Sequence, residues 1–134
     1  MSKHLITLLW IIFAKYSINS DDQPRVLIYI NSRLISLQFL LRKNIYSHRD
    51  INLISFVNHG FFFFILNVYS DNCQSALKYL KDIEVNLNNI IIMMGDFNIR
   101  DSDWDLSFPH HSVHADLLLE IAESFNLELS SPVI

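Results

Sequence analysis

The stretch Ile90-Ile91-Ile92-Met93-Met94-Gly95-Asp96-Phe97-Asn98 is the most informative part of this chain. Five consecutive apolar residues end in Gly-Asp-Phe-Asn, a pattern typical of a buried strand that ends in a polar turn. Side chains two apart on a strand project to the same side, so Asp96 and Asn98 are expected to converge beyond the strand end. Such a pair suits phosphodiester cleavage, because an acid can orient or deprotonate water while a neutral donor holds the phosphate. An inert Asp/Asn turn fits this segment equally well.

The composition describes one ordinary folded domain. The chain has 134 residues, 51% of them hydrophobic and 18% charged, and its mean hydropathy is +0.24, which leaves no sign of disorder. The single Cys73 excludes an internal disulfide. A net charge of −4 argues against a surface that coats nucleic acid generally, although not against an enzyme that grips it along one face. The locally basic interval 33–49 favours a solvated face, because no stacking aromatic residues interleave with its charges.

Residues 1–22 form an apolar N-terminal segment with no domain assignment, and residues 23–134 form the predicted domain. The apolar run from Leu5 to Ala14 is too short to span a bilayer, which needs about 20 residues. A signal peptide is disfavoured because no cleavage site of the small-x-small type follows the run. We therefore expect no membrane association and a buried strand or short helix here.

The apolar pattern predicts an α/β layer structure. Two helical stripes follow the polar breaks, and Asp71 or Asn72 is a candidate cap for the first, Ser112 for the second. Four consecutive phenylalanines, 61–64, imply a strand covered on both faces. Gly95 is expected to remove a side chain where the backbone turns and a phosphate approaches. The expected elements are strands at 26–30, 34–41, 51–57 and 61–69, a three-residue hairpin loop at 58–60, and helices at about 73–87 and 113–125.

Three other groups of residues have patterns that resemble known sites. His110, His111, His114 and Asp116 have zinc-like spacing, but they straddle a predicted helix start and have no second cluster to support them. Alternating acids at 101, 103 and 105 lack the glycine and glutamate of a calcium loop, so a solvated loop is favoured. A nucleophilic Cys73 is disfavoured for want of a nearby histidine.

Gly95-Asp96-Phe97-Asn98, followed by Arg100 and Trp104-Asp105, resembles the GDFN-x-x-x-x-x-W segment of the endonuclease/exonuclease/phosphatase superfamily. The form of this segment is most similar to the endonuclease domain of LINE-type (non-LTR) retrotransposons, as found in fungal elements. Further segments resemble the same domain in the expected order, namely Gln23–Val26, His48–Ile51, Leu66–Asp71 and Leu127–Pro132. The resemblance implies a partial four-layer α/β sandwich that is truncated at both ends.

The resemblance also implies site residues and partners. Asp96 would orient or activate the attacking water, Asn98 would stabilise the pentavalent phosphate, and Tyr69 would lie near the scissile phosphate. The cofactor would be Mg²⁺ and the substrate DNA, which the enzyme would nick. The parent polyprotein would carry a reverse transcriptase and act inside the cell, in the nucleus.

Two parts of the family pattern have no counterpart in this chain. Family members bind the metal through a Glu of a Q-E-P motif and end with an Asp-His pair. Here the first glutamate is Glu84, no aspartate follows Asp116 and no histidine follows His114. The metal ligands are therefore unknown, and hydrolysis is expected to be impaired or lost. The alternative is a non-catalytic relic, or a domain that binds nucleic acid or protein on the same scaffold. We also expect a truncated sheet with exposed edges and apolar faces.

Overall fold

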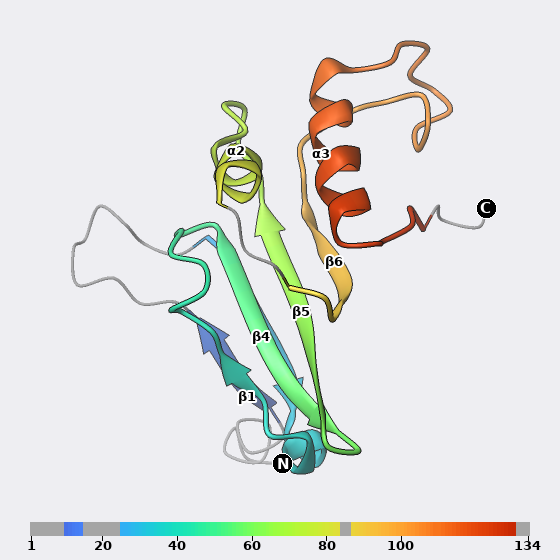
Figure 1. Cartoon of the computed structure of the whole chain (residues 1–134). Helices are drawn as coiled ribbons and strands as arrows, with labels where there is room; N and C mark the ends of the chain where they lie inside the picture. The colour runs from blue at the N-terminus through green and yellow to red at the C-terminus, as the bar shows by residue number, and fades with distance from the viewer. Residues whose placement is uncertain (1–9, 15–24, 84–86, 131–134) are drawn as a thin grey trace, which may run out of the picture.

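The computed structural model describes residues 10–14, 25–83 and 87–130, which form a layered α/β structure (Figure 1). A four-stranded sheet has the order β3-β4-β5-β6, and β1 and β2 form a separate antiparallel pair. Within the four-stranded sheet, β5 and β6 are parallel and the other neighbours are antiparallel. The elements are β1 (Trp10–Ala14), β2 (Leu27–Asn31), the 3-10 helix η2 (Ser32–Leu37), β3 (Leu40–Leu41), β4 (Ile51–Asn58), β5 (Phe61–Tyr69), α2 (Ser75–Asp82), β6 (Ile90–Asp96) and α3 (Val113–Ser124).

Alternate side chains of β4 and β5 enter two different cores. Leu66 and Val68 pack with residues of α2 and α3, whereas Ile54 and Ile65 pack with β2 on the opposite face. This two-residue alternation is what a strand imposes on its side chains. The described residues therefore form three layers, with helices, the four-stranded sheet and the β1–β2 pair stacked in that order. The predicted α/β sandwich is confirmed.

The β4–β5 hairpin closes through two residues. His59 and Gly60 have φ angles of 50° and 79° between the paired ends Asn58 and Phe61. Two successive residues with positive φ characterise the turn whose twist matches that of the flanking strands. The predicted loop of three residues was wrong by one residue, since Asn58 remains in the strand.

The predicted strand at 34–41 is wrong over most of its length. The side chain of Asn31 accepts the backbone N–H of Arg33 at 3.0 Å and starts η2, and Gln38, with φ 52°, ends it before the two-residue β3. Leu34 and Ile35 are exposed, so no core selects the extended form there. Local hydrogen bonding to the backbone outweighed the alternating pattern.

The two predicted helices are present with different lengths. Helix α2 ends at Asp82, because Ile83 is extended with ψ 113°. The N-cap of α2 is Gln74, so the predicted cap at Asp71 or Asn72 was wrong; Asp71, in the turn before the helix, accepts the backbone N–H groups of Cys73 and Ser75 at 3.1 and 3.3 Å. Helix α3 is capped as predicted by Ser112, whose hydroxyl accepts the N–H of His114. No helix among the described residues is long and apolar enough to cross a membrane.

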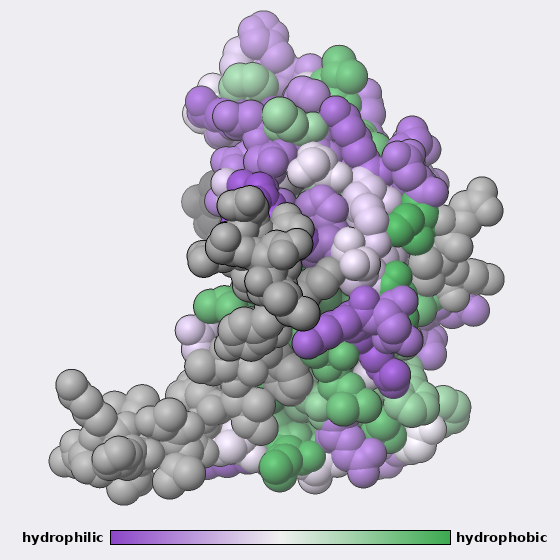
Figure 2. Space-filling view, turned by 90° about the vertical axis from the view of Figure 1, so that its left-hand side faces the viewer, coloured by the Kyte–Doolittle hydropathy of each residue, from purple (hydrophilic) through white to green (hydrophobic). Residues whose placement is uncertain are grey.

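The apolar surface gathers at the hairpin end of the molecule. Figure 2 shows hydrophilic residues over the upper part of this side and hydrophobic ones toward its lower part, the end at which the β4–β5 turn lies in Figure 1. Phe61 and Phe62 are exposed there, so the expectation that both faces of this phenylalanine run are covered was wrong for these two residues. The turn of the β4–β5 hairpin therefore lies beyond helices α2 and α3, which cover the other end of these strands (Figure 1).

Two expectations about apolar strands have different outcomes. β6 was predicted to be buried, but Ile91, Ile92 and Met94 are 41% to 45% exposed, because β6 is the edge strand of the described sheet. This agrees with the expected exposure of edges and apolar faces. In the N-terminal segment, Trp10–Ala14 is a strand, as one of the two alternatives predicted. The rest of residues 1–22 lies outside the described part of the chain.

Gly95 provides a test of the β5–β6 pairing. Its φ is 148°, and a Cβ atom would overlap the backbone carbonyl of Val68 on β5. The close approach of the two strands is thus by itself a sufficient reason for glycine at this position. We expect Gly95→Ala to destabilise the fold by more than about 3 kcal/mol in urea unfolding, since backbone strain adds to the overlap.

The matched control is Gly60→Ala. Gly60 also has positive φ, but a Cβ there meets nothing within 4 Å. Strain alone predicts a loss of about 1 kcal/mol. Equal losses for the two variants would show that the contact with Val68 is unimportant.

Candidate active site

The carboxyl ends of β5 and β6 place Tyr69 beside Asp96. The two strands are parallel and these residues are direct partners in the register. Beyond them, the N–H of Ser70 donates to the carbonyl of Asp96 at 2.8 Å. Binding sites of α/β sheets collect at this edge, where the strands end and loops begin. The structure thus brings together two of the three residues predicted for catalysis.

Asn98 reaches the same edge by a turn and not by strand alternation. Its φ is 51°, in the left-handed region that asparagine tolerates. Its side-chain Nδ2 donates to the carbonyl of Ser70 at 2.8 Å, and its backbone N–H donates to Oδ1 of Asp96 at 3.2 Å. The expected convergence is present, but the predicted reason for it was wrong. An amide has two N–H donors and one acceptor oxygen, so one bond to Ser70 leaves capacity for a ligand.

Arg25 is a component of this edge that the sequence pattern did not single out. Its Nε and Nη2 donate to the two carboxylate oxygens of Asp50 at 2.6 and 2.5 Å, and Nη2 also lies 3.1 Å from Asp71. Its guanidinium carbon lies 4.6 Å from the centre of the Tyr69 ring, a cation–π distance. Asp50 is fully buried. One side chain therefore joins the start of β4, the end of β5 and the aromatic ring of the site.

The charges at this edge are unbalanced toward the negative. Hydrogen bonding from Arg25 holds the pKa of Asp71 below its usual value, so this carboxylate is ionised at neutral pH. Two guanidinium groups, those of Arg25 and Arg49, stand against the carboxylates of Asp50, Asp71 and Asp96. A phosphate that approached Asp96 would meet the negative charge of its carboxylate.

The described residues at this edge do not fit a magnesium site. Asp50 and Asp71 are both occupied by Arg25, which leaves Asp96 as the carboxylate available for an ion. Mg²⁺ is usually held by one or two carboxylates together with substrate phosphates, in near-octahedral geometry. Among the described residues, the group close enough to share an ion is Asp101, Asp103 and His111, which does not include Asp96.

The loop after Asn98 is organised around the buried carboxylate of Asp101. Its oxygens accept the N–H groups of Asp103 at 2.9 Å and Ser112 at 2.6 Å, and one lies 2.9 Å from Nδ1 of His111. Although burial raises the pKa of Asp101, the backbone hydrogen bonds from Ser112 and Asp103 and the charge of His111 lower it below its usual value. The expectation of a solvated acidic loop was wrong for this residue.

The predicted histidine cluster is divided in the structure. His111 lies between two carboxylates, with Nδ1 near Asp101 and Nε2 2.5 Å from Asp116, while His110 and His114 belong to no group of possible metal ligands in the described part of the chain. Within the same part, Cys73 is an exposed free thiol. His111 therefore ties the loop to the first turn of α3.

Removal of the Arg25 guanidinium tests the ion pair. We expect Arg25→Met to lower the free energy of unfolding by about 3 kcal/mol, because it removes the bidentate partner of the buried Asp50 and leaves it the more distant Arg49 and His48, at 3.8 and 3.9 Å. Arg25→Met/Asp50→Asn should recover a large part of that loss, since it removes the uncompensated charge. Urea unfolding of both variants decides the matter. A further loss in the double variant would contradict the ion-pair assignment.

The pair formed by His111 predicts a pH dependence of stability. The hydrogen bond to Asp116 raises the pKa of His111, as does the charge of Asp101, against the lowering effect of burial. Folding thus favours the protonated ring, and its contribution is complete below the unfolded pKa of about 6.5 and is lost as the pH rises through the higher folded value. We expect the difference in Tm between wild type and His111→Gln to be largest below this pH and to shrink above it.

His114→Gln is the control for the pH experiment, because it removes an exposed histidine three residues later, in the first turn of α3. Its Tm should follow that of the wild type at each pH. A pH-independent difference between wild type and His111→Gln would mean that the ring stabilises the loop by packing and not by charge.

Comparison with known proteins supports the fold. No family model and no curated protein matches the sequence. A solved structure, the endonuclease domain of TRAS1, a telomere-specific non-LTR retrotransposon, is similar to this chain with a TM-score of 0.69 and 14% sequence identity. The similarity covers 92% of this chain and 56% of that chain, so this chain spans a little over half of its length. The chain therefore has, over most of its residues, the α/β fold of a non-LTR retrotransposon endonuclease domain.

Proposed function

We propose that this chain contributes one part of a DNA-nicking endonuclease site of the LINE type, and that by itself it hydrolyses phosphodiesters very weakly or not at all. The observation that carries the proposal is the meeting of Tyr69, Asp96 and Asn98 at the carboxyl ends of two parallel strands. These are the residues that match the GDFN motif and the N-V-Y-S-D strand end. The similarity to the TRAS1 endonuclease domain supports the same scaffold.

Each of the three residues has a role that its surroundings permit. Asp96 is exposed and its Oδ1 is oriented by the N–H of Asn98, so its carboxylate can orient or deprotonate a water molecule. The amide of Asn98, fixed by its bond to Ser70, can donate a hydrogen bond to a crowded phosphate. Tyr69 presents a phenol beside them, and Arg25 against its ring holds the ring in place.

The expected loss of hydrolysis follows from the negative charge at this edge and from its shortage of carboxylates that could bind a metal. In such sites Mg²⁺ is the proposed cofactor, and a metal contributes several kcal/mol of transition-state stabilisation, or about three orders of magnitude in rate. The carboxylates of this edge other than Asp96 are held by Arg25. The same observation favours the second candidate function, a non-catalytic domain on this scaffold.

The test is nicking of supercoiled plasmid in the presence of Mg²⁺ by gel-filtered protein, beside the matched variant Asp96→Ala. We expect no nicking above that of the variant. Nicking that disappears in Asp96→Ala would support the endonuclease and overturn the impairment. Fluorescence anisotropy of a labelled DNA duplex then distinguishes a domain that binds DNA without cleaving it from one that does neither.

For the binding measurement we expect a Kd in the range of about 10⁻⁴ to 10⁻⁶ M that weakens as salt increases, as for contacts with the phosphate backbone. Asn98→Ala should weaken it further. A folded protein that neither nicks nor binds DNA would refute a function directed at nucleic acid.

A further inference from the structure

The helix-side face of the four-stranded sheet is covered at one end and open at the other. Side chains two apart on a strand share a face, and four from β5 point to the side of α2 and α3, namely Val68, Leu66, Phe64 and Phe62. The two nearest the candidate active site are fully buried, whereas Phe62, next to the hairpin turn, is 49% exposed. The cover over this face therefore ends before the turn (Figure 1).

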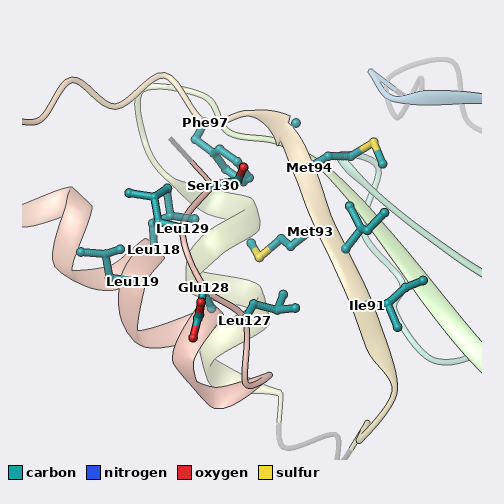
Figure 3. Close-up of a pocket in the computed structure, with 13 residues that line it drawn as sticks. Ile91, Met93, Met94, Phe97, Leu118, Leu119, Leu127, Glu128, Leu129 and Ser130 are labelled. Carbon is teal, nitrogen blue, oxygen red and sulfur yellow. The ribbon is translucent and has the colours of Figure 1, made fainter. Parts of the chain in front are cut away.

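At the covered end the chain packs against itself. Figure 3 shows Met93 of β6 and Leu127 pointing into the space between β6 and α3, with the segment 127–130 beside the helix. The open groove of about 510 Å³ in this region is lined mostly by aliphatic side chains of β6, α3 and that segment. The surface of the sheet near the hairpin turn is of a different kind.

The open end presents an arginine beside an aromatic ring. Residues opposite each other in the register share a face, which places Leu40, Val57 and Phe62 together. The guanidinium carbon of Arg42 lies 5.7 Å from the centre of the Phe62 ring, and its Nε donates to the hydroxyl of the buried Ser55 at 2.7 Å. A guanidinium has five N–H donors, so this bond leaves others that can bind a phosphate. We call Leu40, Arg42, Val57 and Phe62 the hairpin face.

The segments that build this end carry only positive charges. Residues 26–49 and 51–70 contain no aspartate or glutamate, although the whole chain has a net charge of −4. Arg42 and the exposed Lys43 directly follow β3. The interval 33–49 has no stacking aromatic residues between its charges, but the fold supplies one, Phe62, from a distant part of the sequence. The hairpin face thus complements an anion that has a flat aromatic surface.

An amide adjoins the same ring. Asn89, at the start of β6, is exposed, and its Nδ2 donates to the backbone carbonyl of Phe62 at 3.0 Å. An asparagine amide has two N–H donors and an acceptor oxygen, so this bond leaves donor and acceptor capacity next to Phe62. Such a group can hydrogen-bond to the edge of a base that stacks on the ring.

We propose that the hairpin face binds single-stranded nucleic acid. An unpaired base stacks on Phe62, the phosphate backbone contacts Arg42 and Lys43, and Asn89 bonds to the edge of the base. Exposed aromatic side chains of a sheet bind single strands in this way, together with nearby cations. A duplex keeps its bases paired, and a phospholipid surface has no planar ring to stack on, so both fit this face less well.

This contact is separate from the candidate active site. Phe62 and Tyr69 lie at opposite ends of β5, and Asp96 is paired with Tyr69. The inference therefore rests on the surface of the hairpin end and not on the proposed function.

The first experiment measures binding of fluorescein-labelled oligothymidine by fluorescence anisotropy, with a duplex of the same length for comparison. We expect the single strand to bind at least about 10-fold more tightly than the duplex, and Phe62→Ala to weaken its binding about 10-fold, because the stacking of one base is lost. The matched control is Phe61→Ala. It removes the adjacent, more exposed ring from the opposite face and should leave the Kd unchanged.

The second experiment measures how the binding constant depends on salt. Arg42→Gln should reduce the slope of log K against log salt by about 0.7, the value for one phosphate contact with a single strand. Lys78→Gln removes an exposed charge from α2 and should leave the slope unchanged. Circular dichroism checks that all variants are folded.

A folded wild type that does not bind oligothymidine would overturn the proposal, as would equal weakening by Phe61→Ala and Phe62→Ala. Co-sedimentation with phosphatidylserine vesicles in the absence of oligothymidine binding would also overturn it and assign the surface to a membrane. Oligothymidine binding that Phe62→Ala weakens, in a protein that neither nicks plasmid nor binds the duplex, would refute the proposed function alone and support this inference.

Discussion

The close approach of β6 to β5 at Gly95 is the constraint on which the candidate site depends. At this point the backbone of Gly95 lies against the carbonyl of Val68, in a conformation that a side chain would forbid. One residue further along, the parallel register sets Asp96 beside Tyr69, and the hydrogen bond from Ser70 to Asp96 continues the pairing past the end of the strand. If the strands separated here, the carboxylate and the phenol would lose their common edge.

The Arg25 ion pair holds the remaining parts of that edge. A buried carboxylate costs several kcal/mol of desolvation, so Asp50 is tolerable because a bidentate guanidinium meets it. The same guanidinium contacts Tyr69 and Asp71, which lie on or beside the end of β5. Such a pair adds little net stability but defines one arrangement of the strands. The same ion pairs occupy the carboxylates of Asp50 and Asp71, which a cation could otherwise use. Arg25 therefore both stabilises this edge and makes it a poor site for a metal ion.

The local features of this fold could be predicted from the sequence, whereas those that depend on distant residues could not. Ser112 caps α3 through a bond from the N–H of a residue two positions away, and it was identified from the sequence. The motif Gly95–Asn98 indicated the fold that the TRAS1 comparison supports. In contrast, nothing in the sequence near Arg25 indicates that its guanidinium pairs with Asp50, 25 residues later. Arg25 lies two residues before β2 and Asp50 lies directly before β4, and this placement of the two charges does not specify a partner for either.

The candidate site and the outer edge of the described sheet lie at the same place. Asp96 ends the strand whose outer edge has no partner among the described residues, so any polypeptide that pairs with β6 also brings side chains beside Asp96. The chemistry of those side chains then decides what the site can do. Carboxylates would supply the ligands that a magnesium ion requires.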